Sequence, residues 1–188
     1  MTRFNIDKER LSASGINVKN IVAKQNIEIE LDLDYLSSEL PNSSFEPENY
    51  PSLIFRPVGL STVLITRTGV LLFTGADSVA NLQETYECVT SELENLEIES
   101  EKSIDDIEIV NIVTTFSVDS KLNLSHLCVR LGFENTEYEP EVFPGVIYRI
   151  DGGPVVLIFS SGNVVITGAI STKEILDAKN QIKKLIMD

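Results

Sequence analysis

The chain has 188 residues, enough for one well-filled hydrophobic core or for two halves that share a core. No apolar run approaches the roughly 18 residues of a membrane-spanning helix, and the N-terminal segment lacks the apolar centre of a signal peptide, so we expect an intracellular protein without a membrane partner. Fifteen Lys and Arg against twenty-nine Asp and Glu give a formal charge of −14, which by itself argues against a nucleic-acid partner.

The predicted elements occur twice in the same order. Each half contains an apolar strand, a polar segment with helix-like leucine spacing, three short antiparallel strands and a long amphipathic helix. In the first half they are the strand 16–22, the leucines Leu33, Leu36 and Leu40, the strands 53–56, 62–66 and 70–74, and the helix 78–96. In the second half they are the strand 107–114, the leucines Leu124, Leu127 and Leu131, the strands 146–149, 155–159 and 163–167, and the helix 171–186.

Turn and cap residues support these boundaries. Gly69 and Gly162 each lie between the last two short strands of their half, where a tight turn is expected. Ser78 and Ser171 stand where the long helices should begin, as N-caps do. Glu174 follows Ser171 by three residues, which predicts a capping box.

The acidic residues gather in one stretch of the chain. Between Glu84 and Glu108 there are ten acidic residues and one basic residue, Lys102. This density is typical of a solvated face. Cys88 and Cys128 form no metal-binding or redox spacing, so we expect two free, buried thiols.

The chain repeats itself at the level of sequence as well as of pattern. Residues 45–56 return as residues 138–149, at an offset of 93, with six of twelve positions identical. Asn20-Ile21-Val22 returns as Asn111-Ile112-Val113, at an offset of 91. A period this long exceeds that of a solenoid unit and indicates a duplicated half-domain. We therefore predict a first repeat at 16–104, a second at 107–188 and an N-terminal extension at 1–15, with two related surfaces meeting whatever the protein binds.

The last strand of each half is apolar on both of its faces. Leu71 and Phe73 point one way, and Val70 and Leu72 the other. The two long helices can cover only one face of a sheet. The second face is therefore covered by a further layer or a partner, or it is exposed as an apolar patch of the kind that marks an interaction site.

Five motifs occur in two copies and in fixed order: Asn-Ile-Val, Glu-Pro-Glu, Pro-x-x-Ile-x-Arg, Leu-Ile-x-x-x-Gly and Thr-Gly-Ala. In these motifs the chain resembles the TATA-binding protein family in its archaeal, core-only form, over roughly residues 16–187. The resemblance implies a saddle-shaped α+β fold, in which two pseudo-symmetric repeats share one continuous curved antiparallel sheet with helices on the convex face. It also implies that the concave face grips the DNA minor groove.

The minor groove of A·T pairs displays only hydrogen-bond acceptors, so a protein that reads it needs short neutral donors and apolar contact. The resemblance assigns base contacts to Asn20 and Asn111 and backbone contacts to Arg56 and Arg149. A lone Asn in a strand is usually an edge or turn residue, but its duplication here favours DNA reading. The surrounding surface implied by the resemblance consists of Val22, Leu64, Thr66, Leu72, Thr74, Val113, Leu157, Phe159, Val165 and Thr167.

The side chains that kink the DNA differ between the repeats. The family carries two phenylalanines in each repeat, and this chain has Phe143 and Phe159 in the second but Tyr50 and Thr66 in the first. Thr66 cannot wedge a base step open. The lysine that commonly follows the Ser-Gly turn is absent from both repeats, so fewer phosphate contacts remain.

Glu139, Glu141 and Val142 match the segment at which the family docks transcription factor B. The two glutamates could instead form a metal site or an acid–base pair. The only histidine, His126, lies on a predicted helix elsewhere, and no nucleophile accompanies the glutamates, so the docking function is favoured.

The resemblance implies a general transcription initiation factor that binds A·T-rich promoter DNA in the minor groove, bends it and recruits transcription factor B. It implies no enzymatic activity and no cofactor. The partners would be double-stranded promoter DNA and transcription factor B, with the RNA polymerase machinery reached indirectly, at the nucleoid in the cytoplasm of an archaeal cell. The apolar concave face could also pair two copies of the chain.

Two other functions stay open. The missing lysines, Thr66 and the charge of −14 favour a divergent interaction protein that keeps the factor-docking surface but binds DNA weakly or differently. A third interpretation is a saddle-shaped accessory domain that acts on another ligand.

Overall fold

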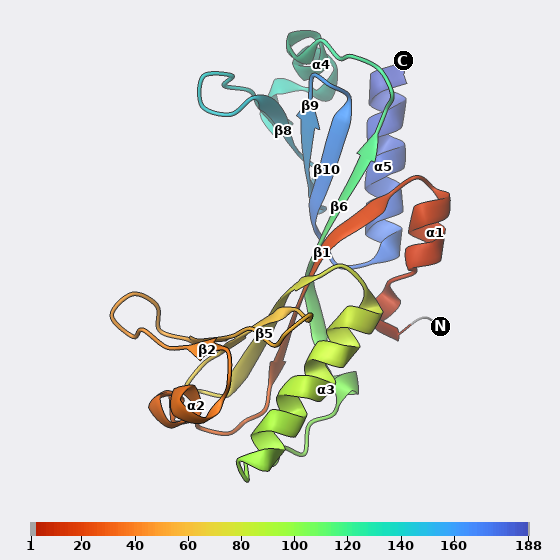
Figure 1. Cartoon of the computed structure of the whole chain (residues 1–188). Helices are drawn as coiled ribbons and strands as arrows, with labels where there is room; N and C mark the ends of the chain where they lie inside the picture. The colour runs from red at the N-terminus through yellow and green to blue at the C-terminus, as the bar shows by residue number, and fades with distance from the viewer. Residues whose placement is uncertain (1–2, 188) are drawn as a thin grey trace. The chain divides into compact units, whose positions relative to one another are not determined.

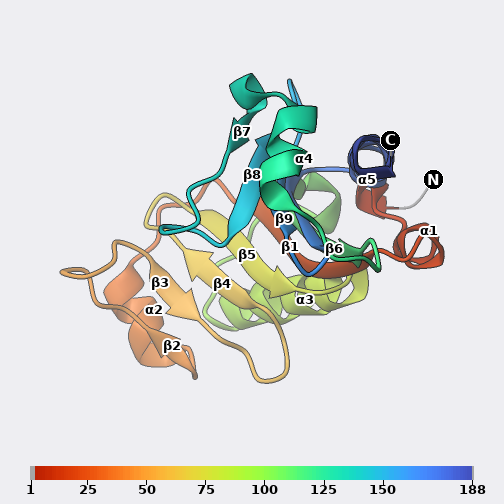
Figure 2. The same cartoon turned by 90° about the horizontal axis from the view of Figure 1, so that it is seen from above.

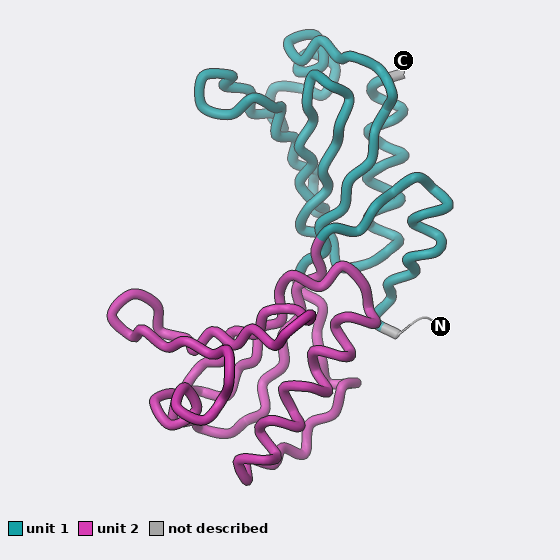
Figure 3. The backbone as a smooth tube through the Cα atoms, in the orientation of Figure 1, with its two compact units in different colours: residues 1–19, 111–188 teal, residues 20–110 magenta. Residues whose placement is uncertain are grey.

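The computed structural model describes residues 3–187 and is shown in two views (Figure 1; Figure 2). It divides into two compact units (Figure 3). One unit contains residues 20–110, and the other contains the residues from Asn111 onward together with those up to Lys19. Through the whole chain the strand order is β2-β3-β4-β5-β1-β6-β10-β9-β8-β7.

The unit of residues 20–110 holds an antiparallel run of five strands. In spatial order these are β2 (Ser43–Ser44), β3 (Leu53–Phe55), β4 (Thr62–Ile65), β5 (Val70–Ala76) and β1 (Asn17–Asn26). The predicted tight turn joins β4 to β5, where the Gly69 N–H donates to the Thr66 carbonyl at 3.1 Å. Burial alternates along β4 and β5, so every second side chain lies in the core.

The other unit repeats this arrangement. Its strands are, in spatial order, β6 (Glu108–Ser117), β10 (Asn163–Ala169), β9 (Val155–Phe159), β8 (Gly145–Arg149) and β7 (Thr136–Glu137). The turn from β9 to β10 is closed by the Gly162 N–H, which donates to the Phe159 carbonyl at 2.9 Å. The two units therefore present equivalent strands in equivalent registers.

The helices pack on the sheet as their apolar spacing predicts. They are α1 (Lys8–Ala13), α2 (Leu33–Glu39), α3 (Val79–Asn95), α4 (Leu124–Leu131) and α5 (Thr172–Met187). The long helix α3 contacts β5 and β4, and Figure 2 shows it on one side of these strands. In the other unit α5 contacts β10, and α4 contacts β8. None of the helices within residues 3–187 is long and apolar enough to cross a membrane.

The predicted caps are present with one change. The Ser78 hydroxyl accepts from the Asn81 N–H at 3.2 Å, and the Ser171 hydroxyl accepts from the Glu174 N–H at 3.3 Å. The Glu174 carboxylate accepts the N–H of Ile170 at 3.0 Å, one residue before the amide that a capping box uses. Ser171 and Glu174 therefore both accept backbone N–H groups at the start of α5, but Glu174 accepts from Ile170 and not from Ser171.

The two faces of the sheet divide as the sequence predicts. Leu71 and Phe73 are 0% exposed, whereas Val70 and Leu72 on the same strand are half-buried. The helices cover the face that carries Leu71 and Phe73. The face that carries Val70 and Leu72 is only half-buried, and its partial burial needs no covering helix from the described part of either unit. The half-buried set forms an apolar surface that remains open.

Three features differ from the sequence prediction. The opening strands extend to Asn26 and Ser117, beyond the predicted ends, because their alternation continues through polar residues that face outward. The N-terminal extension contains α1, which packs on α5 through a buried Leu11. Cys128 is buried as expected, but Cys88 is only half-buried because it lies at the flank of the buried stripe of α3.

Candidate nucleic-acid interface

The half-buried face, here called the open face, gathers most of the predicted contact residues of each unit. In the unit of residues 20–110, Leu64 on β4 lies opposite Leu72 on β5, and Thr62 lies opposite Thr74. Across β3 and β4, Ile54 lies opposite Leu64. The result is a short apolar row edged by threonine hydroxyls.

The same row recurs in the other unit. Leu157 on β9 lies opposite Val165 on β10 and opposite Ile147 on β8. Val113 and Thr167 are half-buried on the adjacent strands. Each unit thus offers a flat, largely apolar strip built from side chains of modest size.

The asparagines are held by backbone bulges. The register between β1 and β5 shifts between Ile21 and Ala23, and at this irregularity Gly75 has φ of +95°. A positive φ of this kind favours glycine, and the bulge leaves the Gly75 N–H outside the strand ladder. That N–H donates to Oδ1 of Asn20 at 2.7 Å.

The second repeat builds the same device. The register between β10 and β6 shifts between Ile166 and Ala169, and Gly168 has φ of +86°. The Gly168 N–H donates to Oδ1 of Asn111 at 2.7 Å. Nδ2 of Asn111 also donates to Oγ1 of Thr167 at 3.4 Å, at the weak end of hydrogen bonding, and its second N–H remains.

These bonds decide which end of each amide is free to act. Because Oδ1 of Asn20 and of Asn111 accepts a backbone N–H, the amide nitrogen is the group left to donate outward. Apolar side chains together with the outward N–H donors of Asn20 and Asn111 match a surface that offers hydrogen-bond acceptors and otherwise apolar contact. The fold, and not the residue type alone, provides this orientation.

The two arginines differ in their surroundings. Arg149 donates from Nε and Nη2 to Oε1 of Glu137, at 3.1 and 3.0 Å, across β8 and β7. Arg56, its equivalent, is exposed and makes no ion pair within residues 3–187. The Arg149 side chain is still 56% exposed, so the ion pair is weak and a phosphate could exchange for Glu137.

The aromatic side chains pair in one repeat only. Phe143 and Phe159 meet edge to face with ring centroids 5.7 Å apart. A Cβ on Gly145 would come within about 3.1 Å of both rings, so the glycine makes room for the pair. In the first repeat Tyr50 is 43% exposed, and Thr66 turns its hydroxyl to accept the Val70 N–H at 2.9 Å.

The predicted factor-docking residues lie on the loop between β7 and β8. Glu139, Glu141 and Val142 are exposed, and Val142 is 80% exposed. The loop is wound by backbone bonds from the N–H groups of Val142 and Phe143 to the Glu139 carbonyl, both 2.9 Å. A large aliphatic side chain that follows two glutamates is thereby exposed on a hydrogen-bonded turn.

No group of three or more His, Cys, Asp or Glu side chains within residues 3–187 is placed to hold a metal ion. Glu139 and Glu141 therefore lack the further ligands that a metal site would require. His126 is exposed on α4, away from this loop in sequence and in its contacts.

The open face also contains a cation that the sequence analysis missed. Lys24 on β1 lies opposite Leu72, in the same row as Leu64, and it forms an ion pair with Glu108 at 3.1 Å. Its equivalent in the other unit is Thr115, which lies opposite Val165. Alternation from Asn20 and Val22 would have placed Lys24 on this face if the strand had been extended past Val22.

Comparison with known proteins gives concordant matches. The family model "Transcription factor TFIID (or TATA-binding protein, TBP)" matches residues 15–96 and again residues 106–188. Relatives include TATA-box-binding protein E of Halobacterium salinarum, 42% identical over 90% of each chain, and the TATA-box-binding protein of Natronomonas pharaonis, 40% identical over 91% of this chain and 90% of that one. The solved structure of Methanococcus jannaschii TBP matches with a TM-score of 0.80 and 36% identity, over 92% of this chain and 98% of that one. The predicted fold class is confirmed by this match and by the strand order.

Proposed function

Because this chain belongs to the TATA-binding protein family, we propose that it is a general transcription initiation factor that binds A·T-rich promoter DNA in the minor groove. The observation that carries the proposal is the pair of bulge-anchored amides, Asn20 on Gly75 and Asn111 on Gly168. Each leaves N–H donors for base acceptors beside the apolar strip of its own unit. The family is one of transcription factors, and the proposed activity is binding without catalysis.

The apolar strip suits the floor of an A·T minor groove. Adenine N3 and thymine O2 are the only polar groups displayed there, whereas a G·C pair adds the guanine N2 amino group as a donor. Side chains such as Leu72 and Leu157 offer nothing to that amino group and would leave it buried without an acceptor. Discrimination against G·C pairs then follows from desolvation as well as from shape.

We propose that the DNA is bent, and more sharply under the second repeat. Phe143 and Phe159 form a ready pair of apolar wedges in the second repeat. Proteins of this class kink DNA by inserting such side chains between base steps. In the first repeat Tyr50 offers one ring, and Thr66 offers none because its hydroxyl closes a turn.

We propose that the loop of Glu139, Glu141 and Val142 docks transcription factor B, through which RNA polymerase would be reached indirectly. Its support is the exposed aliphatic side chain of Val142, which follows the two glutamates on a hydrogen-bonded turn. A basic partner with an apolar pocket would match it. In the first repeat, Asn49 takes the place of Val142, and its amide donates to the Glu46 carboxylate at 2.8 Å, so that turn presents no aliphatic anchor.

The charges of the interface predict a shallow dependence of DNA affinity on salt. Arg149 is held by Glu137, and Lys24 by Glu108, so fewer free cations meet the phosphates than the roughly six to ten of strongly basic binders. Glu137→Gln should strengthen DNA binding and steepen the slope of log affinity against log salt by about one. The matched control, Glu134→Gln, removes a nearby exposed charge without freeing an arginine. Equal effects of the two variants, measured by titration at several salt concentrations, would contradict this account.

The same ion pairs support a second candidate function. A protein that keeps the docking loop but binds DNA weakly would act as an interaction partner of transcription factor B or as a promoter-selective variant. The specific observation in its favour is that Arg149 and Thr66 are both engaged within the protein.

A gel shift with base-analogue duplexes tests the proposal. One duplex carries an A·T-rich site, a second replaces A·T by inosine·cytosine pairs, and a third by G·C pairs. Inosine lacks the guanine N2 amino group, so its minor groove resembles that of A·T while its major groove resembles that of G·C. We expect binding to the first two duplexes and loss on the third. Loss on the inosine duplex would refute minor-groove reading, and binding only when transcription factor B is present would favour the second candidate.

A further inference from the structure

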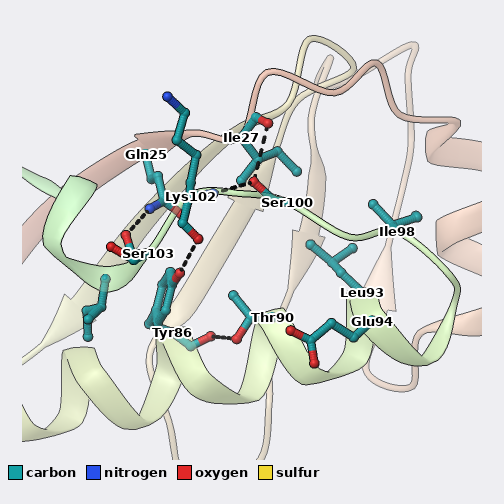
Figure 4. Close-up of a pocket in the computed structure, with 11 residues that line it drawn as sticks. Gln25, Ile27, Tyr86, Thr90, Leu93, Glu94, Ile98, Ser100, Lys102 and Ser103 are labelled. Atoms are coloured by element: carbon teal, nitrogen blue, oxygen red, sulfur yellow. Dashed lines mark hydrogen bonds between the residues drawn. The ribbon is translucent and has the colours of Figure 1, made fainter.

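A groove lies away from the open face, between α3, the end of β1 and the segment that follows α3. This segment, residues 98–104, is here called the connector. Figure 4 shows the groove with its lining side chains, and its volume is about 290 Å³. That volume is just below the range of drug-sized ligand sites, about 300–1,000 Å³, so the groove suits a smaller molecule.

Gln25 closes one end of the groove with an unmet hydrogen-bonding group. The residue is 3% exposed, and its Nε2 donates to the Ser103 carbonyl at 2.6 Å. Its Oε1 is buried and has no hydrogen-bond partner within residues 3–187. A buried acceptor without a donor is destabilising, and such groups in proteins usually meet a ligand or an ordered water.

The remaining walls are largely aliphatic and include one carboxylate. Ile27, Leu93 and Ile98 supply aliphatic surface, and Glu94 follows Leu93 on α3 (Figure 4). The ammonium of Lys102 is turned away from the groove and pairs with Glu28 at 3.0 Å. Glu94 is the acidic residue among the described residues that line the groove, and its charge favours a cationic occupant.

The ring of Tyr86 stands beside Gln25 and completes this end. Its hydroxyl donates to the Lys102 carbonyl at 3.2 Å, and its ring lies 6.3 Å from the Phe73 ring, centroid to centroid, and lines the groove. An aromatic face and an amide oxygen together form a common setting for an ammonium group. Burial raises the pKa of the Tyr86 phenol, so the ring stays neutral at ordinary pH.

The second repeat carries an ammonium at the position of Tyr86. At the repeat offsets of 91 and 93, Gln25 corresponds to Phe116 and Tyr86 corresponds to Lys179. The Lys179 Nζ lies 5.1 Å from the centre of the Phe116 ring and donates to the carbonyl of Ser14. In the second repeat, the segment before β1 supplies a backbone carbonyl next to an aromatic ring, as the connector does in the first repeat.

We propose that the groove between α3 and the connector binds a small amphipathic primary amine, whose ammonium donates to Oε1 of Gln25 and lies near the Tyr86 ring. The carbon body of the amine lies against Leu93, Ile27 and Ile98. In the second repeat, Lys179 shows the same combination of groups, an ammonium beside an aromatic ring and a backbone carbonyl. This inference does not depend on the proposed DNA binding.

A matched pair of ligands tests the donor. Phenethylamine has an aromatic body and an N–H donor, and its N,N,N-trimethyl analogue has the same charge and no donor. In nitrogen–proton NMR spectra of the full chain, phenethylamine should shift the Gln25 side-chain amide and the Leu93 and Ser103 backbone signals saturably, at about millimolar concentration. The trimethyl analogue should bind about tenfold more weakly or worse. Absence of saturable shifts at these residues would overturn the proposal.

The penalty for methylation must depend on Gln25. In Gln25→Met the free oxygen is gone, so the two ligands should bind within about twofold of each other. A penalty of the same size in both proteins would show that the trimethyl group is merely too large, and the proposal would fail.

A second pair of variants covers the case in which Gln25→Met does not fold. Thr90 lines the groove and Ser91 is exposed on the next position of α3. Thr90→Met should fill the groove and weaken phenethylamine binding at least tenfold, whereas Ser91→Met should leave it unchanged. Equal binding by the two variants would place the ligand elsewhere and overturn the proposal.

Discussion

Replacing Asn20 by Asp separates DNA reading from structural anchoring, because the two activities use opposite ends of the same amide. The Asp carboxylate can still accept the Gly75 N–H that Oδ1 of Asn20 accepts at 2.7 Å. It can no longer donate to a base, and it places a negative charge toward acceptors and phosphates. Asn20→Ala does the reverse, since it removes the bond to Gly75 and adds no charge.

The magnitudes follow from these bonds. For Asn20→Asp, an unpaired base acceptor costs about 1–3 kcal/mol, and the added carboxylate costs about 1 kcal/mol more, so affinity should fall roughly 30- to 700-fold. The free energy of unfolding should change by less than about 0.5 kcal/mol. For Asn20→Ala, affinity should fall by a smaller factor, but the protein should lose about 1 kcal/mol of stability through the freed Gly75 N–H.

The test therefore compares the order of the three proteins in DNA affinity with their order in stability. Fluorescence anisotropy on an A·T-rich duplex should rank the proteins wild type, Ala, Asp, whereas urea unfolding should rank wild type and Asp together above Ala. Asn123→Asp is the matched control, because Asn123 also accepts a backbone N–H, from His126 at 3.0 Å, but lies at the start of α4. If affinity follows stability, or if Asn20→Asp binds as well as the control, the assignment of Asn20 to base reading is wrong.

Three further predictions concern the wedges, the docking loop and the buried Lys179. Thr66→Phe should increase the DNA bend, measured by energy transfer between dyes on the duplex ends, and should slow dissociation. It should also lower the stability of the protein by about 1 kcal/mol, because the bond to the Val70 N–H is lost. Thr66→Val loses the same bond without adding a ring and should leave the bend unchanged. Changing Glu139 and Glu141 together to Arg should abolish recruitment of transcription factor B in a gel shift without weakening binary DNA binding, and loss of both would contradict the assignment. Burial, and then the neighbouring Lys183 charge, lower the pKa of Lys179, so the unfolded chain holds more protons and stability should rise with pH toward the ordinary value of 10.5. The wild-type minus Lys179→Met difference in unfolding free energy should show this rise, and a flat difference would refute it.

The sequence alone determined much of the architecture, because local periodicity encodes it. Alternation predicted the half-buried face of β5, and the amphipathic helix predicted at 78–96 is α3, whose buried stripe includes Leu82, Tyr86 and Val89. The duplicated motifs identified the family, which the comparisons confirm. What periodicity could not predict were the short pieces without a pattern, such as β2 and β7, whose pairing is set by their neighbours in the sheet.

The tertiary structure decided how the functional groups are presented. The sequence names Asn20 but cannot say that Gly75, 55 residues later, takes its oxygen and leaves its nitrogen free. Likewise, the engagement of Arg149 by Glu137 and the unpaired oxygen of Gln25 arise only when strands and connector come together. Hydrogen bonds depend on distance and angle between groups remote in sequence. Residue type therefore fixes what a side chain can do, and the fold fixes which of its atoms remain available to do it.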